Sequence, residues 1–285
     1  MKYANPDAVV STQWLEDHLD APDVRVVDAS YYLPIQQRNA RAEYEDEHIP
    51  GAVFFDIDEI ADNSSGLPHM LPPPEKFSSK VRRLGLGSGN RIVVYDGTGM
   101  ASAAARVWWM FRVFGHSDVA VLDGGFPKWL REQRPTEDLP PMPRERHFMA
   151  RVDSTLVRNI DQMISNMESR REQVVDARSA GRFRGVDPEF WPVKKVGRIP
   201  GSRNLPFADL LDDRERTILP PDLIGARFEA AGVDLERPII ATCGSGVTAC
   251  VLALALHLVG HRDIAVYDGS WAEWGAREDT PNEIG

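Results

Sequence analysis

Short runs rich in valine and isoleucine alternate along the chain with longer amphipathic or apolar segments. The six clearest runs cover residues 24–27, 92–95, 119–122, 174–175, 239–242 and 264–267. Runs of this length and composition predict buried strands, and the longer segments between them predict helices. Strands that alternate with helices form a parallel sheet covered by helices on both faces. The pattern therefore predicts an α/β fold.

The second half of the chain repeats the first. Asp96-Gly-Thr-Gly aligns with Cys243-Gly-Ser-Gly, and the run VRVVDAS at 24–30 aligns with QVVDARS at 173–179. The offset between matching positions stays between 145 and 150, so the repeat unit has the size of a domain. We expect two copies of one α/β domain.

The segment between the copies has the composition of a linker. It reads RPTEDLPPMPRERH and holds four prolines among dense charge. Proline cannot continue a helix interior or a strand ladder. We therefore expect a first domain at 1–140, a proline-rich linker at 141–150 and a second domain at 151–285.

The overall charge excludes some partners. The 285 residues include 33 Lys and Arg against 43 Asp and Glu, a net charge of -10. Such a surface repels nucleic acid and anionic membranes. No apolar run reaches the ~20 residues that a membrane helix needs, and the first residues lack an apolar signal-peptide core. The sequence predicts no nucleic-acid partner, no membrane partner and a cytoplasmic location.

The two cysteines have different surroundings. Cys250 lies in the apolar stretch ACVLALAL, where we expect a small buried side chain. Cys243 follows the predicted strand 239–242 and precedes a glycine-rich loop and a helix that begins near Thr248. Loop amides and a helix N-terminus favour an anion, so we expect Cys243 to be an exposed, easily ionised nucleophile. Neither a disulfide framework nor a zinc site fits two cysteines at this spacing.

Asp96 occupies the position of Cys243 in the first copy. A carboxylate cannot perform the chemistry of a thiolate, so the first domain is predicted to be non-catalytic. One active site per chain follows.

Together, these features resemble the two-domain rhodanese superfamily, and within it the 3-mercaptopyruvate sulfurtransferases. The resemblance rests on the tandem repeat, the loop CGSGVT at 243–248, the segment YDGSWAEWG at 267–275 and the two IPG turns. It covers nearly the whole chain. It implies tandem rhodanese-like domains, no metal and no organic cofactor, and a persulfide on Cys243 during turnover.

The resemblance also implies a proton relay. Thiosulfate sulfurtransferases carry two cations directly after the cysteine, whereas this chain has the neutral residues Gly244 and Ser245. A monoanionic donor fits better there than a dianion. In the mercaptopyruvate enzymes the serine acts with a histidine and an aspartate, and the matching residues here are His69 and Asp58. The implied catalytic residues are Cys243, Ser245, His69 and Asp58.

The family pattern further implies a set of substrate-binding residues. The set comprises Arg182, Arg184, Gly244, Gly246, Val247 and Thr248. Arg182 matches the arginine that grips the substrate carboxylate, a task that suits a planar guanidinium. The second family arginine is replaced by Trp191, and Arg184, Lys194 and Lys195 are the candidates to compensate. This departure leaves the donor less determined than the reaction type.

We expect a sulfurtransferase that moves sulfane sulfur from 3-mercaptopyruvate through Cys243 to an acceptor and releases pyruvate. The acceptor is a small thiol, cyanide or a thioredoxin-like protein. One alternative is the same fold with thiosulfate as donor, and another is a non-enzymatic binding module. A cysteine phosphatase is disfavoured, because it needs an arginine six residues after the cysteine and Ala249 stands there.

Overall fold

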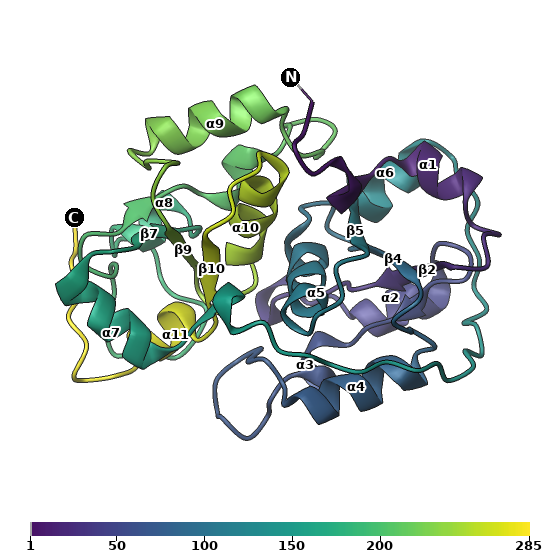
Figure 1. Ribbon diagram of the computed structural model, residues 1–285, viewed down its shortest axis with the longest axis horizontal. Helices are drawn as coiled ribbons and strands as arrows, with labels where there is room; N and C mark the ends of the chain where they lie inside the picture. The colour runs from purple at the N-terminus through teal and green to yellow at the C-terminus, as the bar shows by residue number, and fades with distance from the viewer. Residues whose placement is uncertain (1) are drawn as a thin grey trace.

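The computed structural model describes residues 2–285. Each half of the chain forms one five-stranded sheet in which every neighbouring pair of strands is parallel. Helices cover the sheets, as Figure 1 shows. The predicted α/β fold is confirmed.

The first half contains strands β1 (Val9–Val10), β2 (Val24–Asp28), β3 (Val53–Phe54), β4 (Arg91–Tyr95) and β5 (Val119–Leu122). Its helices are α1 (Thr12–Asp17), α2 (Ala40–Asp46), α3 (Ile57–Ile60), α4 (Pro74–Arg83), α5 (Ser102–Val113) and α6 (Gly125–Arg131).

The second half contains strands β6 (Val157–Arg158), β7 (Gln173–Asp176), β8 (Arg203–Asn204), β9 (Ile239–Thr242) and β10 (Ile264–Tyr267). Its helices are α7 (Ile160–Ser169), α8 (Ala180–Phe183), α9 (Pro221–Ala230), α10 (Ala249–Leu258) and α11 (Ser270–Trp274). Short 3-10 turns lie at Pro6–Ala8, Pro34–Gln36, Ser154–Leu156 and Phe207–Leu210.

The two sheets have the same strand order. It is β1-β5-β4-β2-β3 in the first half and β6-β10-β9-β7-β8 in the second. The middle strand is therefore β4 in one sheet and β9 in the other. Loops that follow the carboxyl end of a middle strand are the usual ligand sites of parallel sheets. The Asp96 and Cys243 loops occupy this place in their respective sheets.

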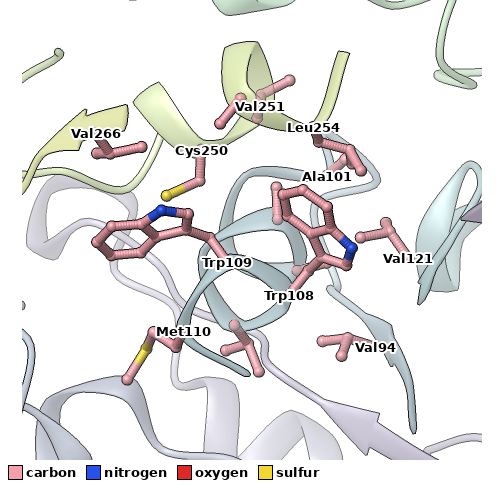
Figure 2. Packing of buried hydrophobic residues seen from close by; sticks show 14 of the residues in the cluster. Val94, Ala101, Trp108, Trp109, Met110, Val121, Cys250, Val251, Leu254 and Val266 are labelled. Carbon is pink, nitrogen blue, oxygen red and sulfur yellow. The ribbon is translucent and has the colours of Figure 1, made fainter. Parts of the chain in front are cut away.

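The two halves share one hydrophobic core. Helices α5 and α10 lie side by side between the sheets (Figure 1) and are buried along most of their length. Trp108 and Trp109 of α5 face Cys250, Val251 and Leu254 of α10 (Figure 2). Helices that are apolar on all sides are stable only when covered on all sides. Each helix thus provides the cover of the other and fixes the two halves in one arrangement.

The predicted linker falls in a stretch without regular structure. Residues 132–153 form no helix or strand. This stretch packs back onto the first half, where the amide of Ala150 donates to Ser78 Oγ at 3.0 Å and the carbonyl of His147 accepts from the amide of Ser88. It is therefore held along the surface of the first half and does not hang free.

Candidate active site

Cys243 stands directly after β9 and at the start of the loop that leads into α10. Its side chain is buried, with 2 % of its surface exposed, so the expectation of an exposed thiol is wrong. The thiol lies instead on the wall of a cavity of about 350 Å³ between the two halves. A small donor must enter that cavity to reach the sulfur.

The loop after Cys243 offers free backbone donors. None of the amides of residues 244–248 donates a hydrogen bond to any group within residues 2–285. Buried amides that lack a protein acceptor create a strong preference for an anionic ligand. Gly246 has a φ of +75°, a backbone conformation that glycine adopts without strain. The loop is thus an anion cradle at the N-terminal end of α10.

The matching loop of the first half pairs the amides of Gly97, Thr98 and Met100 with its own side chains and with Ser30. Asp96 Oδ1 accepts from the amide of Thr98 and Oδ2 from that of Ala104, both at 3.1 Å. The amide of Gly97 donates to Ser30 Oγ at 2.8 Å. The carboxylate of Asp96 therefore takes up amides that could otherwise bind an anion; that the first half is non-catalytic stays a prediction.

Both halves of the chain line the cavity. The second half contributes the residues around the thiol, which include Cys243, Gly244, Ser245, Val247, Thr248 and Arg182. The first half contributes the opposite wall, made of Tyr31, Leu33, Gln36, Thr98, Met100 and Ser102. The wall includes three residues of the Asp96 loop region, which the sequence analysis did not place in the site. They line the cavity because the Asp96 loop and the Cys243 loop face each other across it.

Ser270 is a second residue that the sequence analysis missed. It is fully buried, and its Oγ lies 4.0 Å from the sulfur of Cys243. The same Oγ accepts the amide of Cys243 at 3.1 Å and donates to the carbonyl of Tyr267 at 2.8 Å. Ser270 thus ties the nucleophile to the end of β10. The YDGSW motif was a signal for it, but only the fold shows where its serine points.

His69 and Asp58 come together as predicted from the resemblance. His69 Nδ1 lies 2.8 Å from Asp58 Oδ1, although the angle is not that of a hydrogen bond. The ring of His69 is buried edge-on against Tyr31 and Trp191, with centroids 4.7 and 5.3 Å away. Its Nε2 has no hydrogen-bond partner within residues 2–285. His69 therefore lies directly behind two rings of the cavity wall.

Ser245 is buried in the cavity wall but forms no hydrogen bond with His69 in the described chain. The structure thus joins two members of the predicted relay and leaves the third unconnected. The distances in such networks often shorten only when substrate is bound.

Arg182 reaches the cavity and is already engaged. Its Nε donates to Glu189 Oε2 at 3.0 Å, and its guanidinium lies 4.4 Å from the ring centroid of Phe190. Glu189 also contacts the buried Arg178, which pairs with Asp176. Burial alone would lower the pKa of Arg178, but the two carboxylates hold its pKa above the ordinary value. Two arginines and two carboxylates thus form a cluster without net charge.

The remaining predicted cations lie outside the cavity. Arg184 is exposed and is not among the lining residues. Lys194 pairs with Glu278 at 2.7 Å, and Lys195 Nζ lies 3.2 Å from Thr280 Oγ1. Trp191, in contrast, lines the cavity beside Arg182. The aromatic side chain of Trp191 thus stands in the cavity wall where the family pattern has a second arginine.

Cys250 has the structural role predicted for it. Its thiol is buried against α5 (Figure 2) and donates to the carbonyl of Gly246 at 3.2 Å. Burial raises the pKa of this thiol far above its ordinary value, although the nearby Arg106 opposes the shift.

Within residues 2–285, no helix has both the length and the apolarity to cross a membrane. The same residues hold no group of three or more histidine, cysteine, aspartate and glutamate side chains that could bind a metal ion.

Known proteins resemble this chain along nearly its full length. The model of the rhodanese-like domain matches twice, at residues 11–132 and 159–277. Human 3-mercaptopyruvate sulfurtransferase is 46 % identical over 275 residues, which is 95 % of this chain and 92 % of that protein. Bovine thiosulfate sulfurtransferase is also 46 % identical over 275 residues, 94 % of this chain and 91 % of that protein. Identity alone therefore does not separate the two donors.

Among solved structures, SseA from Escherichia coli, described as a 3-mercaptopyruvate sulfotransferase, superimposes with a TM-score of 0.84. It is 38 % identical, and the match covers 93 % of this chain and 98 % of that one. The resemblance seen in the sequence is confirmed. The two matches to the rhodanese-like domain and the similarity to curated sulfurtransferases along nearly the whole chain show that the chain belongs to the rhodanese family, as a tandem-domain sulfurtransferase.

Proposed function

We propose that this protein takes sulfane sulfur from 3-mercaptopyruvate on Cys243 and passes it to a thiol or to cyanide. The observation that carries the proposal is the set of unpaired amides from Gly244 to Thr248 around the thiol. An amide cradle of this kind stabilises both a thiolate and the persulfide that replaces it.

The charge around the cavity favours a monoanionic donor. Gly244 and Ser245 add no charge beside the sulfur, and the cations Arg178 and Arg182 are balanced by Asp176 and Glu189. A dianion such as thiosulfate gains most from an excess of positive charge, which this cluster lacks. A single carboxylate needs only one planar guanidinium, and Arg182 lines the cavity.

The first half-reaction forms one bond and breaks another. The sulfur of Cys243 attacks the sulfur of 3-mercaptopyruvate, and the C–S bond breaks with its electron pair on carbon. The organic product is the enolate of pyruvate, which needs one proton to become pyruvate. We assign its delivery to Ser245, His69 and Asp58, because His69 is buried beside the cavity wall and faces the carboxylate of Asp58.

The second half-reaction returns the enzyme to its first state. An acceptor thiolate attacks the outer sulfur of the persulfide, and Cys243 leaves as thiolate. A small thiol, cyanide or an exposed thiol of a thioredoxin-like protein can serve as acceptor. The cytoplasmic location is a further part of this proposal and rests on the sequence alone.

Mass spectrometry of the intact protein after exposure to each donor tests the proposal directly. We expect 3-mercaptopyruvate to add the mass of one sulfur atom to the wild type and to Cys250→Ala, and to add none to Cys243→Ser. Thiosulfate should react more slowly at equal concentration.

A faster reaction with thiosulfate would show that thiosulfate is the preferred donor, while Cys243 would remain the nucleophile. A protein that gains no sulfur from either donor would favour the binding module, which is the alternative from another class.

A further inference from the structure

Arg106 reaches from the first half of the chain to the backbone of the loop that follows Cys243 in the second half. It projects from α5, its side chain is fully buried, and its guanidinium lies 4.6 Å from the ring centroid of Trp109. Burial lowers the pKa of Arg106, but the charges of Asp268 and Cys250 and hydrogen bonds with them together hold its pKa above the ordinary value. The guanidinium is therefore a permanent buried cation.

This cation joins the two parts of the site. Its Nη1 donates to the carbonyl of Gly246 in the cradle at 3.2 Å, and its Nη2 donates to the carbonyl of His69. Its Nη2 also lies 2.7 Å from Asp268 Oδ1, while Asp268 Oδ2 accepts the amide of Leu71, two residues after His69, at 2.8 Å. One fork of donors thus holds the histidine segment against the cysteine loop.

The backbone at the His69 end of this contact is strained, and the backbone at the Gly246 end is closely packed. His69 has a φ of +58°, a conformation that is rare for residues other than glycine. At Gly246, an added Cβ would lie 2.6 Å from the carbonyl oxygen of Asp268 and 3.1 Å from Nη1 of Arg106. A left-handed conformation at a residue other than glycine, such as His69, persists only where surrounding contacts enforce it. The Arg106–Asp268 pair supplies these contacts on both sides.

A buried ion pair by itself adds little to stability, because desolvation offsets the attraction between its charges. Hydrophobic contacts between α5 and α10 already hold the two halves together. The hydrogen bonds of Arg106 therefore contribute to the relative position of the two segments rather than to the stability of the fold. They link the backbone of His69 to that of Gly246 in the loop after Cys243.

We infer that Arg106, anchored by Asp268, is the positioning residue that aligns His69 with the Cys243 loop for proton delivery to the enolate. The inference rests on the proposed function. It adds a residue that positions the relay of Ser245, His69 and Asp58 without belonging to it. Arg106 does not line the cavity, so it acts through the backbone of His69 and Gly246 and not on the donor.

The variant R106K tests this role. Lysine keeps the buried charge beside Asp268, but a single ammonium group cannot reproduce the planar fork that reaches two carbonyls. Misplacing a catalytic group by about 1 Å costs on the order of 100-fold in rate. We expect R106K to form the persulfide from 3-mercaptopyruvate about 100-fold more slowly at saturation, with KM nearly unchanged because Arg182 is untouched.

Thiosulfate supplies the readout that a purely structural role would not change. Its leaving group, sulfite, departs without a proton, so the relay is not needed. We expect R106K to lose about tenfold less rate with thiosulfate than with 3-mercaptopyruvate. The matched control is R112K, on the same helix, because Arg112 packs over Trp108 away from the cavity; it should keep the wild-type ratio of the two rates.

A double-mutant cycle with H69N completes the test. If Arg106 acts through His69, adding R106K to H69N should lower the 3-mercaptopyruvate rate by no more than about threefold. D268N should reproduce the donor pattern of R106K, and near-UV circular dichroism should show that both variants are folded.

Several results would overturn the inference: a wild-type rate in R106K, an equal loss with both donors, or the same 100-fold loss in the H69N background. A wild type that gains no sulfur from 3-mercaptopyruvate would instead refute the proposed function, so the two failures are distinguishable.

Discussion

Glu189→Gln is the substitution for which the structure gives the sharpest prediction. Glu189 has 4 % of its side chain exposed, and one carboxylate oxygen engages Arg182 while the other engages Arg178. A donor carboxylate that binds Arg182 must share it with this internal anion. Glutamine keeps the shape and removes the charge, and Arg178 retains its pair with Asp176.

The expected size follows from Coulomb's law. A carboxylate bound on the free edge of Arg182 lies about 5 Å from Glu189, and unit charges at that distance interact by ~3 kcal/mol at an effective dielectric constant of about 20. Solvent in the open cavity and relaxation reduce this by about half. The remaining ~1.4 kcal/mol corresponds to a tenfold lower KM for a monoanion. Thiosulfate carries two charges, so its KM should fall by about 100-fold.

The assay is single-turnover persulfide formation with each donor at two salt concentrations. E189Q should shift the preference toward thiosulfate by about tenfold, and higher salt should reduce the shift. Glu172→Gln is the matched control, since Glu172 pairs with Arg158 at 2.8 Å and does not line the cavity. An increase of KM by the same factor for both donors would refute the reasoning, because Glu189 would then hold Arg182 in place and not compete for it.

Two further predictions concern backbone fit and pH. In urea denaturation, Gly246→Ala should destabilise the protein by at least ~1 kcal/mol more than Gly201→Ala. Both glycines have φ near +75°, but only at Gly246 would the added Cβ meet Asp268. Equal losses of stability would contradict this. Burial, with a smaller contribution from Arg112, lowers the pKa of His257 to about 4. Because the unfolded chain then binds a proton below pH ~6.5 and the folded chain does not, the free energy of unfolding should fall as pH drops from 6.5 to 4. The fall should be smaller in His257→Gln, and an identical slope in the variant would refute the assignment.

The sequence predicted the middle of each sheet better than its edges. Strands β4 and β9 are runs of β-branched residues buried on both faces, so composition alone marks them. Strands β1, β3, β6 and β8 have two residues each and were not predicted. Pairing at a sheet edge depends on which chain segment tertiary packing brings alongside, and a two-residue run carries no periodicity.

The nucleophile was predictable from the sequence, and its partners were not. Cys243 is marked by the strand before it and the glycines after it. Glu189 stands seven residues beyond Arg182 in a stretch without regular structure, so nothing in its spacing indicates that it engages Arg182. Arg106 lies within an apolar helix, where its position resembles that of an ordinary solvent-exposed charge until the second half of the chain is packed against it.

The carboxylate of Asp96 makes the two sides of the cavity differ in their attraction for an anion. The Asp96 and Cys243 loops face the same cavity, because Thr98 and Met100 line it together with Ser245. Two open amide cradles would offer a small anionic donor two competing positions. In the first half, Asp96 already accepts the amide of Thr98, and this leaves a wall with weak attraction for anions. We therefore expect the Asp96 loop to direct the donor sulfur to Cys243.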